Sequence, residues 1–228
     1  MYYSQTANGV TDGNSTEPIC KPTQFDNYVF ATRWPPSVCI NQQCANATEN
    51  WVIHGLWPNY KNDSWPQFCC KKWHFNVDNI SSIVPQMENV WPNLETGKAY
   101  YSLWKHEWLK HGTCTYGQYN SELDYFDAAL QVNSKYTIEQ YLENAGIKPT
   151  DTAQNPVNTS MIHTALESKL NKKVHLECTN VKKEISPYPL LTTIFVCLDK
   201  QNLEPIDCTQ KEAGCSDQLI IPSLKFPH

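Results

Sequence analysis

WKHEWLKHGTC, residues 104–114, is the most informative segment of this 228-residue chain. We expect a helix over Tyr100–His111 that ends at Gly112, because glycine commonly follows the last turn of a helix. At about 100° per residue, four ionisable side chains then share an arc of about 140°, and these are His106, Glu107, Lys110 and His111. Trp108 and Leu109 face the other way, towards a protein core. Because an enclosed helix cannot carry such charges unpaired, the cluster predicts a functional site.

The His-Glu pair also opens the zinc-binding pattern H-E-x-x-H, in which two histidines lie one turn apart on the same helix face. In this chain Lys110 stands four residues after His106, and the second histidine comes one residue later. Lysine is a poor zinc ligand, so the spacing disfavours a metalloprotease. We expect neither a metal nor another cofactor.

A second candidate segment is His54-Gly55-Leu56-Trp57-Pro58, at the end of an apolar, β-prone stretch. A lone histidine among aromatic residues is more often part of a core than a catalyst. Together with the helix, however, His54 supplies what RNA cleavage without a metal needs. One histidine removes the proton of the ribose 2′-OH, another protonates the departing 5′ oxygen, and Lys110 and Glu107 suit stabilisation of the phosphorane.

The composition indicates an oxidising compartment. Ten cysteines without a C-x-x-C pair favour disulfides over a structural zinc site. Five N-x-S/T sequons are typical of a secreted glycoprotein, and they begin at Asn14, Asn46, Asn62, Asn79 and Asn158. No stretch approaches the roughly 18 apolar residues of a membrane span. The net charge of −5 argues against a protein that coats nucleic acid with a basic surface.

Residue periodicity predicts one mixed α and β domain over residues 25–228, preceded by an extended arm over residues 1–24. The expected strands are Phe25–Trp34, Trp51–Trp57, Val174–Cys178 and Leu191–Leu198. The other expected helices are Ile80–Trp91, with Asp78 as N-cap and with Pro85 either kinking the helix or restricting it to its first turn, then Ser121–Val132, Thr137–Ala145 and Met161–Leu170. The apolar face expected for Ser121–Val132 consists of Leu123, Phe126, Ala129 and Leu130.

The segments around His54 and His106–His111 resemble the two catalytic-site signatures of the ribonuclease T2 family. The resemblance runs from about Phe25 to Cys215 and includes Trp34-Pro35-Pro36 and Trp91-Pro92-Asn93. It implies an α+β fold in which helices pack on a central antiparallel sheet.

It also implies a role for each ionisable residue. His111 would take the 2′ proton, His54 would protonate the leaving group, and His106 would bind the phosphate. Glu107 and Lys110 would stabilise the pentacoordinate state. The product would be a 2′,3′-cyclic phosphate, which is then hydrolysed to a 3′-phosphate.

The resemblance marks six candidate substrate-binding side chains, which are Trp57, Asn59, Trp65, Asn93, Leu103 and Arg33. Trp57 would stack on the base 5′ of the cut, and Asn59 would contact the edge of that base. Stacking tolerates any base, so we expect low base specificity. Packing within its own loop is the alternative for Trp65. Arg33 stands where many plant members have glutamine, and a surface charge is the alternative for it.

The resemblance further implies four disulfides, Cys39–Cys44, Cys69–Cys114, Cys178–Cys215 and Cys197–Cys208. The fifth would then join Cys20 and Cys70. Each bridge is expected to add about 2–4 kcal/mol to the free energy of unfolding. Cys69–Cys114 would also tie the end of the catalytic helix to the loop after His54.

We therefore predict a metal-independent endoribonuclease that acts on single-stranded RNA. We expect it to be a monomer with an acidic pH optimum, in a secreted or lysosome-like location. A competing hypothesis is a secreted glycoprotein that acts mainly through receptor or glycan binding. A pure binder has no need of five clustered ionisable residues, which disfavours that hypothesis.

Overall fold

The computed structural model describes residues 20–45, 47–209 and 212–227. Most of the predicted arm and the sequons at Asn14 and Asn46 lie outside these ranges. The helices are α1 (Pro35–Val38), α2 (Val84–Val90), α3 (Ser102–Lys110), α4 (Glu122–Lys135), α5 (Ile138–Asn144) and α6 (Thr159–Leu170), with 3-10 turns η1 (Cys39–Asn41), η2 (Val77–Ile80) and η3 (Gly112–Thr115). The strands are β1 (Asn27–Arg33), β2 (Val52–Asn59), β3 (Val157–Asn158), β4 (His175–Thr179), β5 (Leu190–Asp199), β6 (Pro205–Ile206) and β7 (Gln218–Leu219).

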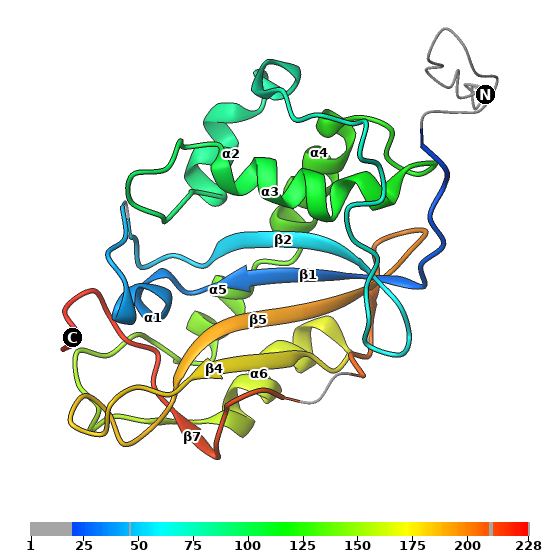
Figure 1. Cartoon of the computed structure of the whole chain (residues 1–228). Coiled ribbons are helices and arrows are strands. Elements are labelled where there is room, and N and C mark those ends of the chain that lie inside the picture. Colours follow the sequence, from blue (N-terminus) through cyan, green and yellow to red (C-terminus); the bar gives the residue numbers. More distant parts are fainter. Residues whose placement is uncertain (1–19, 46, 210–211, 228) are drawn as a thin grey trace, which may run out of the picture.

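The main sheet is antiparallel, with strand order β2-β1-β5-β4, and β6 pairs with β5. β3 and β7 pair separately. Figure 1 shows α2, α3 and α4 grouped on the β2 side of this sheet, with α6 on the β4 side. This arrangement confirms the predicted α+β fold.

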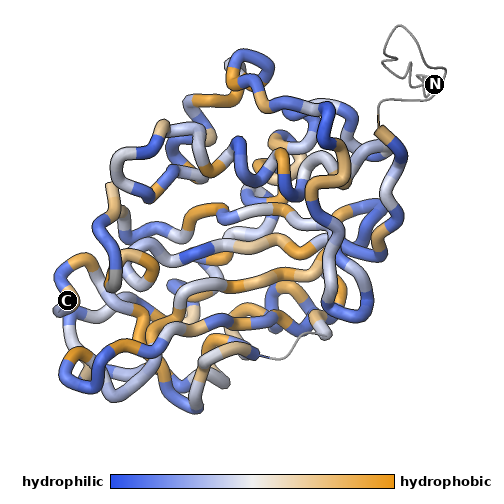
Figure 2. Tube along the Cα trace, viewed as in Figure 1, coloured by the Kyte–Doolittle hydropathy of each residue, from blue (hydrophilic) through white to orange (hydrophobic). Residues whose placement is uncertain are grey.

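One face of the sheet packs against the helices. The large core combines strand residues with aromatic side chains of the helices, among them Phe30, Leu56, Ile194, Trp108 and Phe126. Figure 2 shows hydrophobic stretches along the central strands and hydrophilic stretches in the surrounding loops. Burial of these aromatic side chains is the main stabilising contribution, at about 1.5–3 kcal/mol for each large apolar side chain.

The opposite face of the sheet carries a second, smaller cluster. In β1, Tyr28 belongs to the large core, whereas the next residue, Val29, packs with Cys197 and Cys208 in the small cluster. Successive strand residues point to opposite faces, which explains the change of cluster. Trp57 packs against this small cluster, so its indole lies on the face away from the large core.

A β-bulge in β2 sets the position of His54. Ala31 of β1 pairs with Gly55, and the next residue, Thr32, pairs with Ile53. His54 is therefore the extra residue between two regular pairs. A bulge bends the strand locally and re-aims a side chain, which distinguishes His54 from its neighbours in the ladder.

Three expectations about the helices are wrong. Pro85 neither kinks a helix nor ends one, because α2 begins at Val84 and Pro85 lies in its first turn, where the missing N–H is tolerated. Asp78 is not an N-cap, because it lies inside η2, where its own N–H donates to the side chain of Asn76. In α4, Leu123 is 37% exposed and Tyr125 is buried in its place.

The helix before Gly112 ends one residue earlier than expected. The last residue of α3 is Lys110, and His111 is its C-cap. Gly112 starts η3 and has no positive φ. A Cβ at this position would collide with the ring of Trp108, so close packing explains this glycine.

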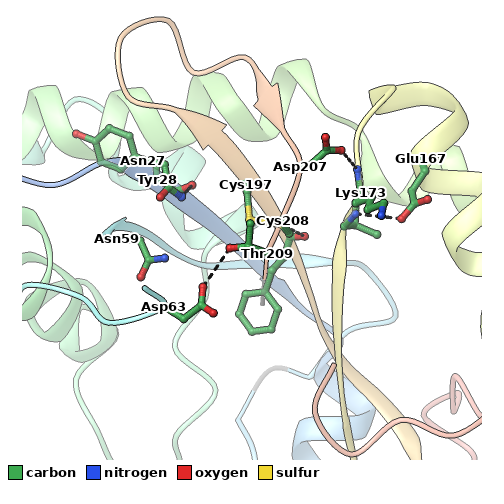
Figure 3. Close-up of a disulfide and its surroundings, with 12 residues drawn as sticks. Asn27, Tyr28, Asn59, Asp63, Glu167, Lys173, Cys197, Asp207, Cys208 and Thr209 are labelled. Atoms are coloured by element: carbon green, nitrogen blue, oxygen red, sulfur yellow. Dashed lines mark hydrogen bonds between the residues drawn. A yellow bond between two sulfur atoms is a disulfide. The ribbon is translucent and has the colours of Figure 1, made fainter. Parts of the chain in front are cut away.

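All ten cysteines form disulfides. Four are the pairs that the resemblance implies, Cys39–Cys44, Cys69–Cys114, Cys178–Cys215 and Cys197–Cys208, and the fifth is the remaining pair, Cys20–Cys70. Figure 3 shows Cys197–Cys208 close to Asn59 and Thr209. Across the described ranges, none of the helices has the length and apolar character needed to cross a bilayer.

Candidate active site

The candidate catalytic residues come from β2 and α3. His54 lies at the bulge in β2, while His106, Glu107 and Lys110 belong to α3, which ends at His111. Two links hold the end of α3 to the chain that follows β2. The N–H of Phe68 donates to the carbonyl of Lys110 at 2.9 Å, and the next residue forms the Cys69–Cys114 disulfide.

Trp57 stands between the two candidate acid–base histidines. Its ring centroid lies 5.1 Å from that of His54, edge to face, and 5.2 Å from that of His111, stacked. Its Nε1 donates a 2.6 Å hydrogen bond to Oε2 of Glu107. A single indole thus contacts three of the five candidate catalytic side chains.

Both of these histidines are neutral in the free protein at physiological pH. The pKa of His54 is lowered to about 3, first by burial and then by the charges of Arg33, His106 and Lys110. The pKa of His111 is also lowered, by burial first and then by Lys110. Because His106 and Lys110 act on both imidazoles, all four side chains belong to one electrostatic site.

Glu107 is only 1% exposed, and burial raises its pKa to about 8. The hydrogen bond from Trp57 and the charges of Lys110 and Arg33 oppose this shift. The carboxyl group is therefore protonated at acidic pH, and a protonated carboxyl can donate a hydrogen bond to an anion. His106 is exposed on the same helix.

The alternative interpretation of Arg33 as a surface charge is wrong. Its side chain is half-buried at the end of β1, and Nη2 donates to the carbonyl of Pro92 at 3.2 Å. Its Nε has no hydrogen-bond partner among the described residues. The guanidinium lowers the pKa values of His54 and Glu107, so it lies within the field of the site. Sequence reasoning missed this role because burial of the arginine depends on the distant loop that contains Pro92.

The other candidate binding residues fall into two groups. Near the end of β2, Trp65 is 51% exposed, so packing within its loop does not account for the position of its ring. Asn59 is buried, and its Nδ2 donates to the carbonyl of Tyr60. The second group lies near α3. Asn93 lines a cavity of about 370 Å³ together with Tyr100 and Trp104, and its side-chain amide forms hydrogen bonds with the backbone of its own loop. Leu103 packs partly buried against the large core.

In the described ranges, no group of three or more His, Cys, Asp or Glu side chains has an arrangement suited to a metal ion. The site instead combines two neutral imidazoles, one buried carboxyl group and two cations. Such a set can exchange protons with a phosphodiester and stabilise added negative charge.

Comparison with known proteins agrees with this chemistry. A model of the Ribonuclease T2 family matches residues 25–208. The chain belongs to the ribonuclease T2 family. It is 36% identical over 196 residues to Ribonuclease Oy of Magallana gigas, covering 83% of this chain and 90% of that protein. It is 34% identical over 216 residues to Intracellular ribonuclease LX of Solanum lycopersicum, covering 90% and 88% of the two chains.

Solved structures of ribonucleases have the same fold as this T2-family chain. RNase NT in complex with 5′-AMP superposes with a TM-score of 0.78 at 32% identity, covering 88% of this chain and 99% of that one. A mutant of RNase MC1 in complex with 5′-UMP superposes with a TM-score of 0.76 at 27% identity, covering 87% and 99%. The chain is an endoribonuclease of the ribonuclease T2 type.

Gly55 gives a first test of the geometry in this ribonuclease. An alanine Cβ at this position would fall on Nε1 of Trp57 and Oε2 of Glu107. We expect Gly55→Ala to lower kcat about tenfold, because the added methyl group displaces Trp57 and Glu107 and breaks a neutral hydrogen bond worth about 0.5–1.5 kcal/mol. Cleavage of a dinucleotide by purified protein measures this effect. Ser82→Ala changes an exposed residue outside the site, is the control and should keep kcat; equal kcat values for both variants would contradict the prediction.

Proposed function

We propose that this endoribonuclease cleaves single-stranded RNA by attack of the ribose 2′-OH on the adjacent phosphorus, without a metal ion. The observation that carries the proposal is the contact of Trp57 with His54, His111 and Glu107. It brings two imidazoles and a carboxyl group together around one indole ring. The first product is a 2′,3′-cyclic phosphate, and water then opens it to a 3′-phosphate.

In this mechanism, His111 accepts the 2′ proton and His54 donates a proton to the departing 5′ oxygen. His106 binds the phosphate. Lys110 and the protonated Glu107 stabilise the negative charge of the phosphorane. In the second step the two imidazoles exchange roles, since water then takes the place of the leaving group.

The lowered pKa values support an acidic pH optimum. A general base works above its pKa and a general acid works below its pKa, so lowering both values moves the whole activity profile towards acid. The bound phosphate is an anion and favours protonated histidine, which returns the acid, His54, to its working state.

Stacking supports low base specificity. Trp57 and the exposed Trp65 present aromatic faces, and every base has a face that can stack. Two relatives in the structural comparison were solved with different nucleotides, 5′-AMP and 5′-UMP. The edge of the base would meet Asn59 on one side of the cut, and Asn93, Leu103 and Arg33 on the other side.

The five disulfides support secretion or a lysosome-like compartment, since thiols stay reduced in the cytosol. Asn62 and Asn158 are exposed and are the sequons best placed to carry glycans. Asn79 is also exposed, but its amide nitrogen donates to Glu122. We propose a monomer. Relatives named as ribonucleases do not favour the alternative of a glycoprotein that acts mainly through a receptor.

Cleavage of single-stranded RNA in excess EDTA tests the proposal directly. We expect the same rate with and without chelator, because the proposed acid, base and cations are all side chains. Mass spectrometry of early products should show a 2′,3′-cyclic phosphate before the 3′-phosphate. A rate that falls on chelation and returns with added zinc, or products with 5′-phosphates, would refute this mechanism.

A further inference from the structure

The loop between β2 and Cys69 exposes two large aromatic rings close to the site. Trp65 is 51% exposed and Phe68 is 49% exposed, while Pro66 between them is buried. Trp65 is already a candidate base-binding residue. Phe68 is not, and it belongs to none of the three hydrophobic clusters, so packing does not explain it.

Phe68 also has an unfavourable backbone conformation. Its φ of 51° lies in the left-handed region, which is costly for a residue with a bulky side chain. Glycine or asparagine would adopt the same φ at a lower cost. An exposed aromatic ring on strained backbone is the combination that points to binding rather than to stability.

The backbone of this loop is held at several points. Besides the hydrogen bond from Phe68 N–H to Lys110 and the Cys69–Cys114 disulfide, the N–H of Tyr60 donates to the carbonyl of Ser64 at 2.8 Å. Thr209 donates to the carboxylate of Asp63, as Figure 3 shows. The ring is thus presented beside the last turn of α3 without the entropic cost of ordering a loose loop.

The charge around the loop suits a nucleic-acid strand. Residues 60–72 contain Lys61, Lys71 and Lys72 against one acidic residue, Asp63, although the whole chain has a net charge of −5. Lys61 and Lys71 are exposed. Sites for single-stranded nucleic acid combine such cations with aromatic platforms.

We propose that Phe68 is the stacking platform of an additional subsite, which binds the next nucleobase on the 5′ side of the two that flank the cut. The occupant is a base of the same RNA strand. The backbone of Phe68 is hydrogen-bonded to the end of the catalytic helix, and Phe68 follows Trp65, which is the candidate platform for the base 5′ of the cut. Lys71 lies three residues further on and can meet the backbone phosphate. The inference rests on the proposed function.

A comparison of substrates of different length separates this subsite from the two base sites that flank the cut. We would compare kcat/KM for a dinucleotide, for a trinucleotide extended at the 5′ end and for a trinucleotide with an abasic 5′ residue. One stacked base is worth about a 5- to 100-fold gain, so the wild type should favour the full trinucleotide over the other two by that factor. The absence of any such gain in the wild type would overturn the proposal.

Three variants identify the residue responsible. Phe68→Leu keeps an apolar side chain without a π face, and should remove most of the gain. Phe68→Trp should keep the gain, and Leu224→Ala, which truncates another exposed apolar side chain, should leave it unchanged. Phe68→Asn should relieve the backbone strain, raising Tm while the gain is lost. A gain that survives in both the Leu and Asn variants would refute the subsite.

Binding of uncleavable 2′-deoxy trinucleotides separates failure of the subsite from failure of the proposed reaction. The titration needs no turnover, and we expect Kd to rise about 5- to 100-fold in Phe68→Leu relative to the wild type. If RNA is not cleaved but this difference is present, the proposed reaction is wrong and the subsite stands. If RNA is cleaved and the Kd values are equal, the reaction stands and the subsite is wrong.

Discussion

His111→Phe is expected to lower kcat for RNA cleavage by about 10²–10⁴-fold while the protein remains folded. His111 is the proposed base for the 2′-OH, and phenylalanine cannot accept a proton. The fold should survive because His111 is only 4% exposed and stacks on Trp57, a contact that a phenyl ring can keep. Its Nδ1 has no hydrogen-bond partner in the described part of the chain, so the substitution removes no such bond there.

The measurement is the initial rate on a dinucleotide at acidic pH, together with the Tm of both proteins. Hydrolysis of a 2′,3′-cyclic phosphate should fall as well, because the two imidazoles serve both steps. His74→Phe is the matched control, since His74 is an exposed histidine outside the site. A His111 variant that keeps its Tm and more than a tenth of the wild-type rate would show that another group is the base.

The sequence predicted the clustering of the ionisable side chains on α3 better than it predicted the surroundings of that cluster. Helical geometry alone places Glu107 and Lys110 on one face with two histidines, because the period of an α-helix does not depend on tertiary structure. The bulge at His54 depends on the register of β1 against β2, and neither strand determines that register by itself. The hydrogen bond from Trp57 to Glu107 requires both segments and was not predictable from either.

Other differences have a similar physical origin. Whether Arg33 is a surface charge or a cation of the site depends on the carbonyl of Pro92, 59 positions along the chain. Pro85 fits the first turn of a helix as well as it breaks a later turn, so the outcome depended on where α2 begins. The strain at Phe68 follows from two links to α3 and Cys114, which no local pattern reveals.

Glu107→Gln is expected to stabilise the protein at neutral pH. Burial raises the pKa of Glu107 from 4.5 to about 8, so the folded protein holds this proton more tightly than the unfolded chain. The stability contributed by the bound proton is fully present below pH 4.5 and is lost as the pH rises through about 8. Glutamine cannot ionise and avoids the loss, which is about 2–4 kcal/mol at pH 7, or roughly 5–10 °C in Tm.

The pH dependence distinguishes this effect from ordinary repacking. The difference in Tm between Glu107→Gln and the wild type should be near zero at pH 4 and should grow up to pH 8. Glu143→Gln changes an exposed glutamate and should give no such trend. Two melting profiles that stay parallel from pH 4 to 8 would show that Glu107 has the same pKa in the folded and unfolded chains.

Activity of a matched pair of variants tests the same carboxyl group as a hydrogen-bond donor. Glutamine can accept from Nε1 of Trp57 and still donate to a phosphorane oxygen, as protonated Glu107 does. Leucine is equally neutral but can do neither. We therefore expect kcat at acidic pH to fall at most about tenfold in Glu107→Gln and about 10²–10³-fold in Glu107→Leu. Equal losses in both variants would mean that Glu107 acts only as an anion, and its raised pKa would then hinder the reaction rather than serve it.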